Sequence, residues 1–273
     1  MLSINTNIGA LNASQSSYSV NNSMETSMAR LSSGNRINSA ADDAAGLQIA
    51  RRMDTEIQGL NQAVRNAADA QALLQTAEGA LDEVHTILLR IRELSVQASN
   101  GTYGAQDRLA IQAEVTDLQS EITRISNDTT WNSISLIEGS QSTGITFQIG
   151  ADNTQTVTVA IANIALATLS IGGTSQVTTA TNAMSYIAAV DKAISVISTN
   201  RGTYAAAINR LDHSVANMQD AATNLAEAKG RITDADFAAE TSNLSRTQVL
   251  QQASMAMLAQ ANAAKQNILT LIQ

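Results

Sequence analysis

The stretch AEGALDEVHTILLRIRELSVQAS, residues 77 to 99, decides the fold. Its apolar or small residues recur at alternating intervals of four and three, at Ala77, Leu81, Val84, Leu88, Ile91, Ser95 and Ala98. This spacing places them along one side of an α-helix, in the heptad pattern of helices that pack lengthwise. The stretch therefore predicts a long helix that buries one stripe of its surface.

The same stripe continues upstream through Ile57, Leu60, Val64, Ala67 and Leu74. We therefore expect one helix from about residue 44 to residue 99, which would be roughly 80 Å long. Asn100 and Gly101 end it, and a second helix follows with Ile111, Val115, Leu118, Ile122 and Ile125 at the same spacing.

Heptad spacing returns in the last third of the chain, in two more helices. The first runs through Ile187, Val190, Ile194, Ile197, Arg201, Tyr204, Ile208, Leu211, Val215, Met218, Ala222 and Leu225. After a break at Gly230, the second uses Leu250, Ser254, Met257, Ala261, Ala264, Ile268 and Leu271. At the other end of the chain, Ile4, Ile8, Leu11 and Tyr18 form a narrower stripe. We expect the terminal helices to pair antiparallel through these stripes, and to stay disordered until another surface covers them.

The period changes to two in the middle of the chain. Ile145, Phe147 and Ile149 alternate with polar residues and are answered by Val157, Val159 and Ile161, which predicts a β-hairpin. The fold class is therefore mainly α, a long antiparallel coiled-coil-like helix bundle with a small β-hairpin region. We expect residues 1–43 and 234–273 to form a terminal coiled-coil domain. Residues 44–233 would form a helical domain with a hairpin at about 143–163 and a short variable linker at about 166–185.

Composition excludes several classes of protein. The chain has no cysteine and no proline, a net charge of −8, and no dense cluster of Lys and Arg, so neither disulfides nor nucleic-acid binding is expected. The N-terminal residues lack the basic and apolar regions of a cleavable signal peptide. No apolar run is long enough to span a membrane. These rules alone favour a cytosolic protein.

Few residues suggest catalysis or metal binding. His85 and His213 each lie in a heptad helix without a second ligand at i+4. Asp42 and Asp43 would lie in the first turn of the long helix, where carboxylates favour the positive end of the helix dipole. No Gly-rich phosphate motif and no nucleophile motif occurs. We therefore expect no enzyme, no cofactor and no metal.

Several stretches together resemble one family. RLSSGNRINSAADDAAGLQIA resembles the N-terminal signature of bacterial flagellins, and so do INTNIGALNA, QTAEGALDEVHTILLRIRELSVQASNGT and IQAEVTDLQSEITRIS. FQIGADNTQTVTV resembles the hairpin of that family. NRLDHSVANMQDAATNLAEAKGRITDADFAAE and SMAMLAQANAAKQNILTLIQ resemble its C-terminal region. The resemblance covers nearly the whole chain, in order.

The resemblance implies a structural subunit that polymerises with itself into the flagellar filament for swimming. The terminal helices would form an inner tube, with Ile8, Leu11, Tyr18, Leu250, Met257, Ile268 and Leu271 as assembly residues. The long helices and the hairpin would form an outer tube, in a minimal form that lacks large outer domains. Arg30, Arg36, Asp42 and Asp43 would lie in the spoke that joins the tubes, as capping or inter-subunit partners.

The resemblance also implies partners and a route of export. Subunits would leave unfolded through the flagellar type III apparatus without a cleavable signal, so the expected location is extracellular. The expected partners are the flagellar cap, the hook–filament junction proteins and an export chaperone that binds the C-terminal region. No nucleic acid and no membrane is expected as a partner.

A host receptor, Toll-like receptor 5, is a further partner that the resemblance implies. LRIRELSVQ, residues 89 to 97, is similar to the family's receptor-binding pattern. Arg90, Glu93, Leu94 and Gln97 fall on that pattern, and Glu114 matches the partner position on the next helix. Arg90, Leu94 and Gln97 share a helix face by spacing, and that face could equally be a contact between subunits.

Two other functions fit parts of the sequence. The hook–filament junction protein has similar ends, although both terminal signatures here are closer to flagellin. A soluble coiled-coil binding or signalling module would form a discrete oligomer and no fibres. One local departure from the family is Asn132-Ser133 after Trp131, where Asn-Gly is usual, and it predicts a reshaped or strained turn.

Overall fold

The computed structural model describes residues 6–141, 143–173 and 176–272, and residues 265–272 by their backbone alone. The chain divides into two compact units: the first holds the residues up to Thr55 and from Asn224 onward, the second Glu56–Thr223. The elements, in chain order, are α1 (Ile8–Ser33), α2 (Ala44–Ser99), α3 (Ala105–Asp128), β1 (Thr130–Trp131), β2 (Ile134–Ser135), β3 (Ile145–Gln148), β4 (Thr156–Val159), α4 (Leu166–Leu169), α5 (Ala180–Thr233) and α6 (Phe237–Ile272).

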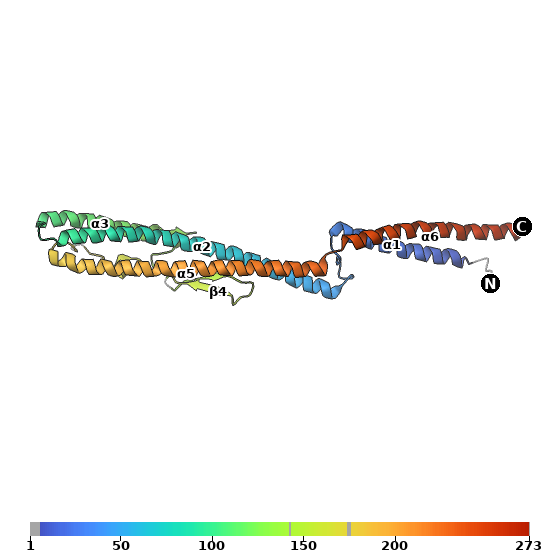
Figure 1. Ribbon diagram of the computed structural model, residues 1–273, viewed down its shortest axis with the longest axis horizontal. Helices are drawn as coiled ribbons and strands as arrows, with labels where there is room; N and C mark the ends of the chain where they lie inside the picture. Colours follow the sequence, from blue (N-terminus) through green and yellow to red (C-terminus); the bar gives the residue numbers. More distant parts are fainter. Residues whose placement is uncertain (1–5, 142, 174–175, 273) are drawn as a thin grey trace. The chain divides into compact units, whose positions relative to one another are not determined.

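The core of the second unit lies between α2, α3 and α5, which run side by side with α5 antiparallel to α2 (Figure 1). All seven residues of the predicted stripe on α2 have 0% exposure, so the heptad prediction is confirmed. Tyr204 and Leu211 of α5 and Ile122 of α3 complete this core with no exposed surface. At the edge of the core, the Arg201 guanidinium lies 2.7 Å from Glu78 and 2.8 Å from Asp82, which fixes the register of α5 against α2.

Helix α2 begins and ends where the sequence predicted. Its last carbonyls are satisfied by α3, because Arg108 donates from Nε to Ala98 O at 2.8 Å and from Nη2 to Asn100 O at 3.1 Å. Orphan carbonyls at a helix end need such partners. This contact holds the turn between α2 and α3 closed.

Two small hairpins follow α3. In the predicted one, β3 pairs antiparallel with β4 in the register Ile145↔Val159 and Phe147↔Val157, as the alternation indicated. The second, β1 with β2, was expected only as a turn. Its two central residues, Asn132 and Ser133, have φ of 47° and 66°. Positive φ at both positions is the pattern of a type I′ turn, so the turn is kept with serine in place of glycine.

The segment expected to be a variable linker, 166–185, is mostly ordered structure. It contains α4 and the first residues of α5, and Leu169, Ile171 and Val177 are buried. Its backbone is bonded to neighbouring helices, because Gln119 Nε2 donates to Ile171 O at 2.6 Å and Val177 N donates to Gln112 Oε1 at 2.9 Å. The linker prediction was therefore wrong for these residues, since buried amides of α3 anchor them.

In the first unit, α1 and α6 lie side by side and antiparallel (Figure 1). Both are helical over the described residues. Gly34, with φ of 71°, ends α1 in the left-handed conformation that glycine adopts without strain. The chain then runs to α2, while residues 234–236 join α5 to α6.

Candidate functional site

The contact between α1 and α6 mixes small and polar residues with a few apolar ones. On α1 the half-buried or buried positions recur in heptads, and on α6 they do so opposite them. They are Ala10, Ala13, Ser17, Val20, Met24 and Ser27 on α1, and Thr247, Gln251, Ser254, Leu258 and Ala261 on α6. Gln251 Nε2 donates to Asn21 Oδ1 at 2.7 Å, and Asn7 Nδ2 donates to Ala261 O at 3.2 Å. Small side chains let the two backbones approach closely, and these amide bonds hold their register.

Ser254 and Ala261 of the predicted stripe lie in this contact, but the larger apolar residues of the predicted stripes face outward. Ile8, Leu11 and Tyr18 are 61%, 61% and 65% exposed, and Leu250 and Met257 are 45% and 65% exposed. The prediction that these residues form the α1–α6 contact was therefore wrong for the described ones. The side chains of Ile268 and Leu271 lie outside the described residues. Each terminal helix thus has two faces, a mixed one against the other helix and an apolar one that no other described residue covers.

A groove of about 560 Å³ opens between the two helices, with Leu250 and Met257 of α6 in its lining. It is lined by Gly9, Asn12, Ala13, Ser16, Leu250, Ala253, Ser254, Met257, Gln260, Ala261 and Ala264. Exposed apolar side chains that gather on one surface mark a site of association.

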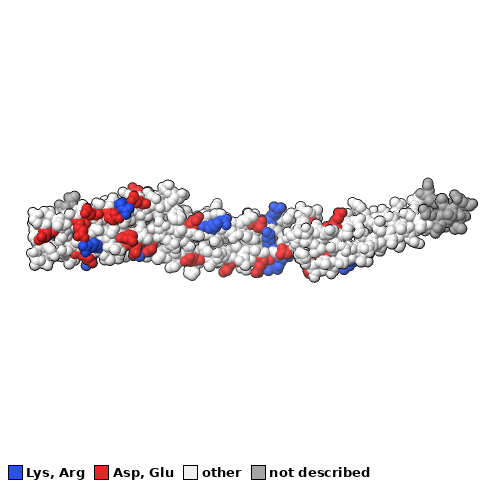
Figure 2. Space-filling model, turned by 90° about the horizontal axis from the view of Figure 1, so that it is seen from above, with Lys and Arg blue, Asp and Glu red and all other residues white. Residues whose placement is uncertain are grey.

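Charge is almost absent from this surface. In α1 the charged residues are Glu25 and Arg30, and in α6 up to Ala264 they are Glu240 and Arg246. In the view of Figure 2, the Lys, Arg, Asp and Glu side chains gather over other parts of the chain and leave much of the α1–α6 surface without charge. Charged residues are depleted in the cores of protein interfaces, so the composition favours association here.

Arg36 lies in the connection between α1 and α2 and caps the end of α5. Its Nη2 donates to Ile232 O at 2.7 Å and its backbone N donates to Thr233 O at 2.6 Å. Beside it, Asn35 and Asp234 form an antiparallel bridge, and Ala235 N donates to Gly34 O at 2.9 Å. A cation at a helix C-terminus is favoured by the dipole, so Arg36 has the capping role that was one of its two expected roles.

The adjacent aspartates have different tasks, and neither lies in the first turn of α2. Asp43 directly precedes the helix and accepts from Gly46 N at 2.9 Å, which is an N-cap. Asp42 accepts from Ser39 N, Ser39 Oγ and Asn38 N, and so closes the turn before it. These hydrogen bonds lower the pKa of Asp42, with a smaller contribution from the positive charge of Arg30.

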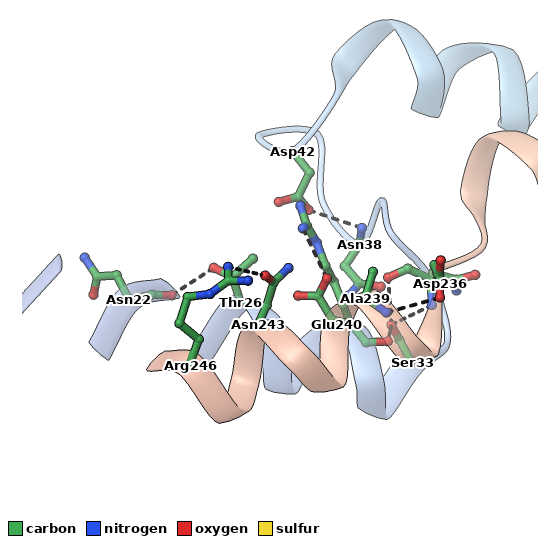
Figure 3. A network of polar contacts seen from close by, with 12 residues as sticks. Asn22, Thr26, Ser33, Asn38, Asp42, Asp236, Ala239, Glu240, Asn243 and Arg246 are labelled. Atoms are coloured by element: carbon green, nitrogen blue, oxygen red, sulfur yellow. Dashed lines mark hydrogen bonds and ion pairs between the residues drawn. The ribbon is translucent and has the colours of Figure 1, made fainter. Parts of the chain in front are cut away.

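Arg30 lies near the end of α1, beside Glu240 of α6. Its Nη1 is 4.0 Å from Glu240 Oε2, and Glu240 is 8% exposed. Figure 3 shows Glu240 among Thr26, Asn243 and Arg246, in a polar patch between the two helices. Sequence reasoning missed the α6 half of this patch, because Glu240 and Arg246 fall outside the apolar heptads.

The residues implied for receptor binding lie on α2 and α3 in the second unit. Arg90 donates from Nη2 to Glu114 Oε1 at 2.8 Å and from Nη1 to Glu93 Oε2 at 3.3 Å, and these contacts raise the pKa of Arg90. Gln97 is exposed and donates to Tyr103 Oη at 3.1 Å. Leu94 is 2% exposed, so it belongs to the core and not to the exposed face.

The described part of the chain forms no candidate metal site elsewhere. His85 and His213 are not joined there by other candidate metal ligands. Within the same residues, no helix is long and apolar enough to cross a membrane.

Comparison with known proteins decides the family. The profile described as the bacterial flagellin N-terminal helical region matches residues 4–142, and that of the C-terminal helical region matches residues 187–272. The chain belongs to the bacterial flagellin family. It is a structural subunit of the flagellar filament and not an enzyme. A flagellin of Halalkalibacterium halodurans is 42% identical over 99% of both chains, and one of Bacillus subtilis is 39% identical over 99% of both.

Solved structures agree with this assignment. The crystal structure of Bacillus cereus flagellin is 32% identical, with a TM-score of 0.51, and the match covers 60% of this chain and 94% of that one. A putative flagellar hook-associated protein from Vibrio parahaemolyticus has a TM-score of 0.60 over 71% of this chain and all of that one. It is only 14% identical, so it shows a shared fold alone.

Proposed function

We propose that this flagellin polymerises through the outward apolar face of its terminal helices. The observation that carries the proposal is the exposure of Leu11 and Tyr18 on α1 and of Met257 in the α1–α6 groove. Water exposure of such side chains is unfavourable by roughly 1.5–3 kcal/mol each, and burial against a neighbouring subunit recovers that free energy. The contact between α1 and α6 leaves this face free for other copies, which would build the inner tube.

Seeded elongation tests the proposal. Monomer added to short filament fragments should lengthen them, as seen by electron microscopy, and Leu11→Ser and Met257→Ser should each raise the monomer concentration needed for growth. Gln252→Ser, also exposed on α6 but outside the groove, is the matched control and should elongate as the wild type does. Absence of wild-type elongation at every salt concentration would reject polymerisation. Normal growth of both variants would reject this surface.

We further propose that the subunit leaves the cell through the flagellar type III apparatus and is located in the extracellular filament. Helices that bury so little surface between themselves suit a chain that is exported unfolded and folds fully on assembly. The cap, the hook–filament junction proteins and a chaperone for the C-terminal region would be its transient partners. Mass spectrometry of sheared filaments checks the route. An intact N-terminus is expected, and a shortened one would show that a signal peptide is cleaved.

A second proposed activity is binding to Toll-like receptor 5 through Arg90, Glu93, Gln97 and Glu114. The supporting observation is that Arg90 and Glu114 pair at 2.8 Å across α2 and α3, with both side chains about half exposed. Such a pair presents a fixed polar pattern to a partner. Leu94 is left out of the proposed contact set because it is buried.

A receptor reporter assay with matched variants decides this binding. Arg90→Ala and Glu114→Ala should each weaken the response to the monomer. Arg92→Ala is the control, since Arg92 forms a similarly exposed pair with Asp191 of α5, at 2.6 Å, outside the proposed set. Equal responses from all variants would remove these residues from the proposal.

The two rival functions have simple discriminators. A hook–filament junction protein would be a minor component of sheared surface material, whereas a filament subunit dominates it. A coiled-coil binding module would give a stable discrete oligomer in light scattering and would form no fibres at any seed concentration.

A further inference from the structure

The polar patch between α1 and α6 is an incomplete set of charged groups. Arg30 Nε is a buried nitrogen with no hydrogen-bond partner among the described residues. The nearest carboxylate, Glu240, is 4.0 Å from Arg30 Nη1, which is beyond hydrogen-bonding distance. A buried donor without an acceptor is unfavourable, so this guanidinium lacks an acceptor that the chain itself does not supply.

The surrounding cleft is open and carries excess positive charge. It has a volume of about 370 Å³, which is room for a side chain, and Arg30, Arg246 and Glu240 are its charged residues. Arg246 donates to Asn243 Oδ1 at 2.9 Å and has no carboxylate partner among the described residues. In Figure 3 its side chain extends from α6 toward Thr26 of α1.

Among the described residues, no uncharged group of the cleft accepts a hydrogen bond from Arg30 Nε. The hydroxyls of Thr26 and Thr247 already donate to carbonyls of their own helices, at 2.9 Å to Asn22 O and 3.0 Å to Asn243 O. The free donors are therefore guanidinium N–H groups. A carboxylate is the acceptor that guanidinium groups bind best, often with two parallel hydrogen bonds.

We propose that a carboxylate of a second copy of this chain, that of Glu25, enters this cleft and pairs with Arg30 and Arg246. Glu25 is exposed on α1 and forms no hydrogen bond or ion pair with another described residue. Among the described residues of α1 and α6, the one other carboxylate is Glu240, which already lies in the cleft, whereas Glu227, also exposed and without a printed partner, belongs to α5. Glu25 is five residues before Arg30, which places it about 140° around the helix, so it faces away from its own cleft.

This geometry makes the contact head-to-tail. The donor cleft and the acceptor lie on different faces of the same helix pair, so each copy offers a cleft to one neighbour and a carboxylate to another. Heterologous contacts of this kind propagate into an open helical filament when they do not close into a ring. The inference rests on the proposed polymerisation and specifies the polar contact that sets its register.

Charge reversal tests the pair. Arg246→Glu and Glu25→Arg should each slow seeded elongation at least about tenfold, since each leaves like charges in the contact. The double variant should recover most of the wild-type rate. Both residues are exposed in the monomer, so circular dichroism should show unchanged helicity in all three variants. Wild-type rates in the single variants, or a double variant no better than either single one, would overturn the contact.

A cross-linking experiment separates this inference from the proposed function. The chain has no cysteine, so every disulfide must come from introduced residues. Chains carrying Glu25→Cys, mixed with chains carrying Arg246→Cys, should form mainly heterodimers on mild oxidation. Heterodimers without elongation of the wild type would support the contact and reject polymerisation. Elongation of the wild type with only random homodimers would support polymerisation and reject the contact.

Discussion

At the scale of single residues, Ser133 has a backbone conformation that its side chain disfavours. It has φ of 66° in the β1–β2 turn, and the left-handed region costs a non-glycine residue roughly 1–2 kcal/mol. Glycine removes this strain but loses more entropy on folding, by roughly 0.5–1 kcal/mol. Ser133→Gly should therefore stabilise the second unit by about 0.5–1 kcal/mol, measured as a rise in its thermal unfolding midpoint.

A glycine in a helix provides the control for this variant. Ser198 is exposed in the middle of α5, where glycine is less favourable than other residues by up to about 1 kcal/mol. Ser198→Gly should lower the midpoint while Ser133→Gly raises it. A fall in both would show that the turn carries no strain.

Two buried tyrosines make stability depend on alkaline pH. Burial raises the pKa of Tyr204 and of Tyr186, against smaller opposing effects of their hydrogen bonds. The folded pKa lies above the unfolded one, so the neutral phenols contribute their full stability below the unfolded pKa. This contribution is lost as pH rises through the folded pKa. The free energy of unfolding should therefore fall above about pH 10.

Denaturant unfolding at a series of pH values checks this dependence. Tyr204→Phe should show a shallower fall at alkaline pH than the wild type. At neutral pH it should lose about 1–3 kcal/mol, because Ala162 N, which donates to Tyr204 Oη at 2.7 Å, is left without an acceptor. An unchanged alkaline slope would mean that Tyr204 is not the titrating group.

At the scale of elements, the Arg36 contact joins the ends of helices far apart in sequence. Arg36→Glu would place a negative charge against the carbonyl end of α5, where the dipole is also negative. We expect helicity of the monomer to change little and filament shape or assembly to change, because the connection between α1 and α2 loses its anchor. Circular dichroism and electron microscopy of the same preparation provide the two readouts. Arg36→Lys keeps the charge and should retain the wild-type form.

How far the sequence predicted each element depended on its apolar content. The limits of α2 followed from uninterrupted heptads and from Asn100 and Gly101, because a stripe that is buried along its whole length leaves a clear period. The segment from α4 to α5 was mistaken for a linker, since its order comes from Gln112 and Gln119 of α3. A buried amide that bonds a distant backbone has no local signature in the sequence.

The terminal helices show a second limit of periodicity. The stripe through Leu11 and Tyr18 is a genuine apolar face, but a period does not say which surface covers it. The chain places Ala13, Ser17, Val20 and Met24 against α6 and leaves Leu11 and Tyr18 outside. A contact that mixes small, polar and apolar residues gives only a weak apolar period, although it determines which face is available to other copies.

At the scale of the whole molecule, the two units differ in how many apolar residues each buries by itself. Glu56–Thr223 holds nearly all of the buried apolar residues, whereas the first unit has few beyond Ile37 and Ala50. Most of the stability of a helix in water comes from packing of its apolar face. The second unit should therefore fold independently, and the terminal helices should depend on each other and on neighbouring subunits.

Deletion of residues 240–273 tests this division. The deletion removes the partner of α1, so α1 should unfold together with the loss of α6, and ellipticity at 222 nm should fall by the share of those two helices. The second unit keeps its core and should unfold cooperatively at nearly the wild-type temperature. Filament assembly should be abolished, because the groove and the apolar face are gone.

A chain with the residues of α6 restored in scrambled order is the control and should also fail to assemble. Loss of the cooperative transition in the shortened chain would show that the helices of the second unit need the terminal pair, and the division into two units would then be wrong.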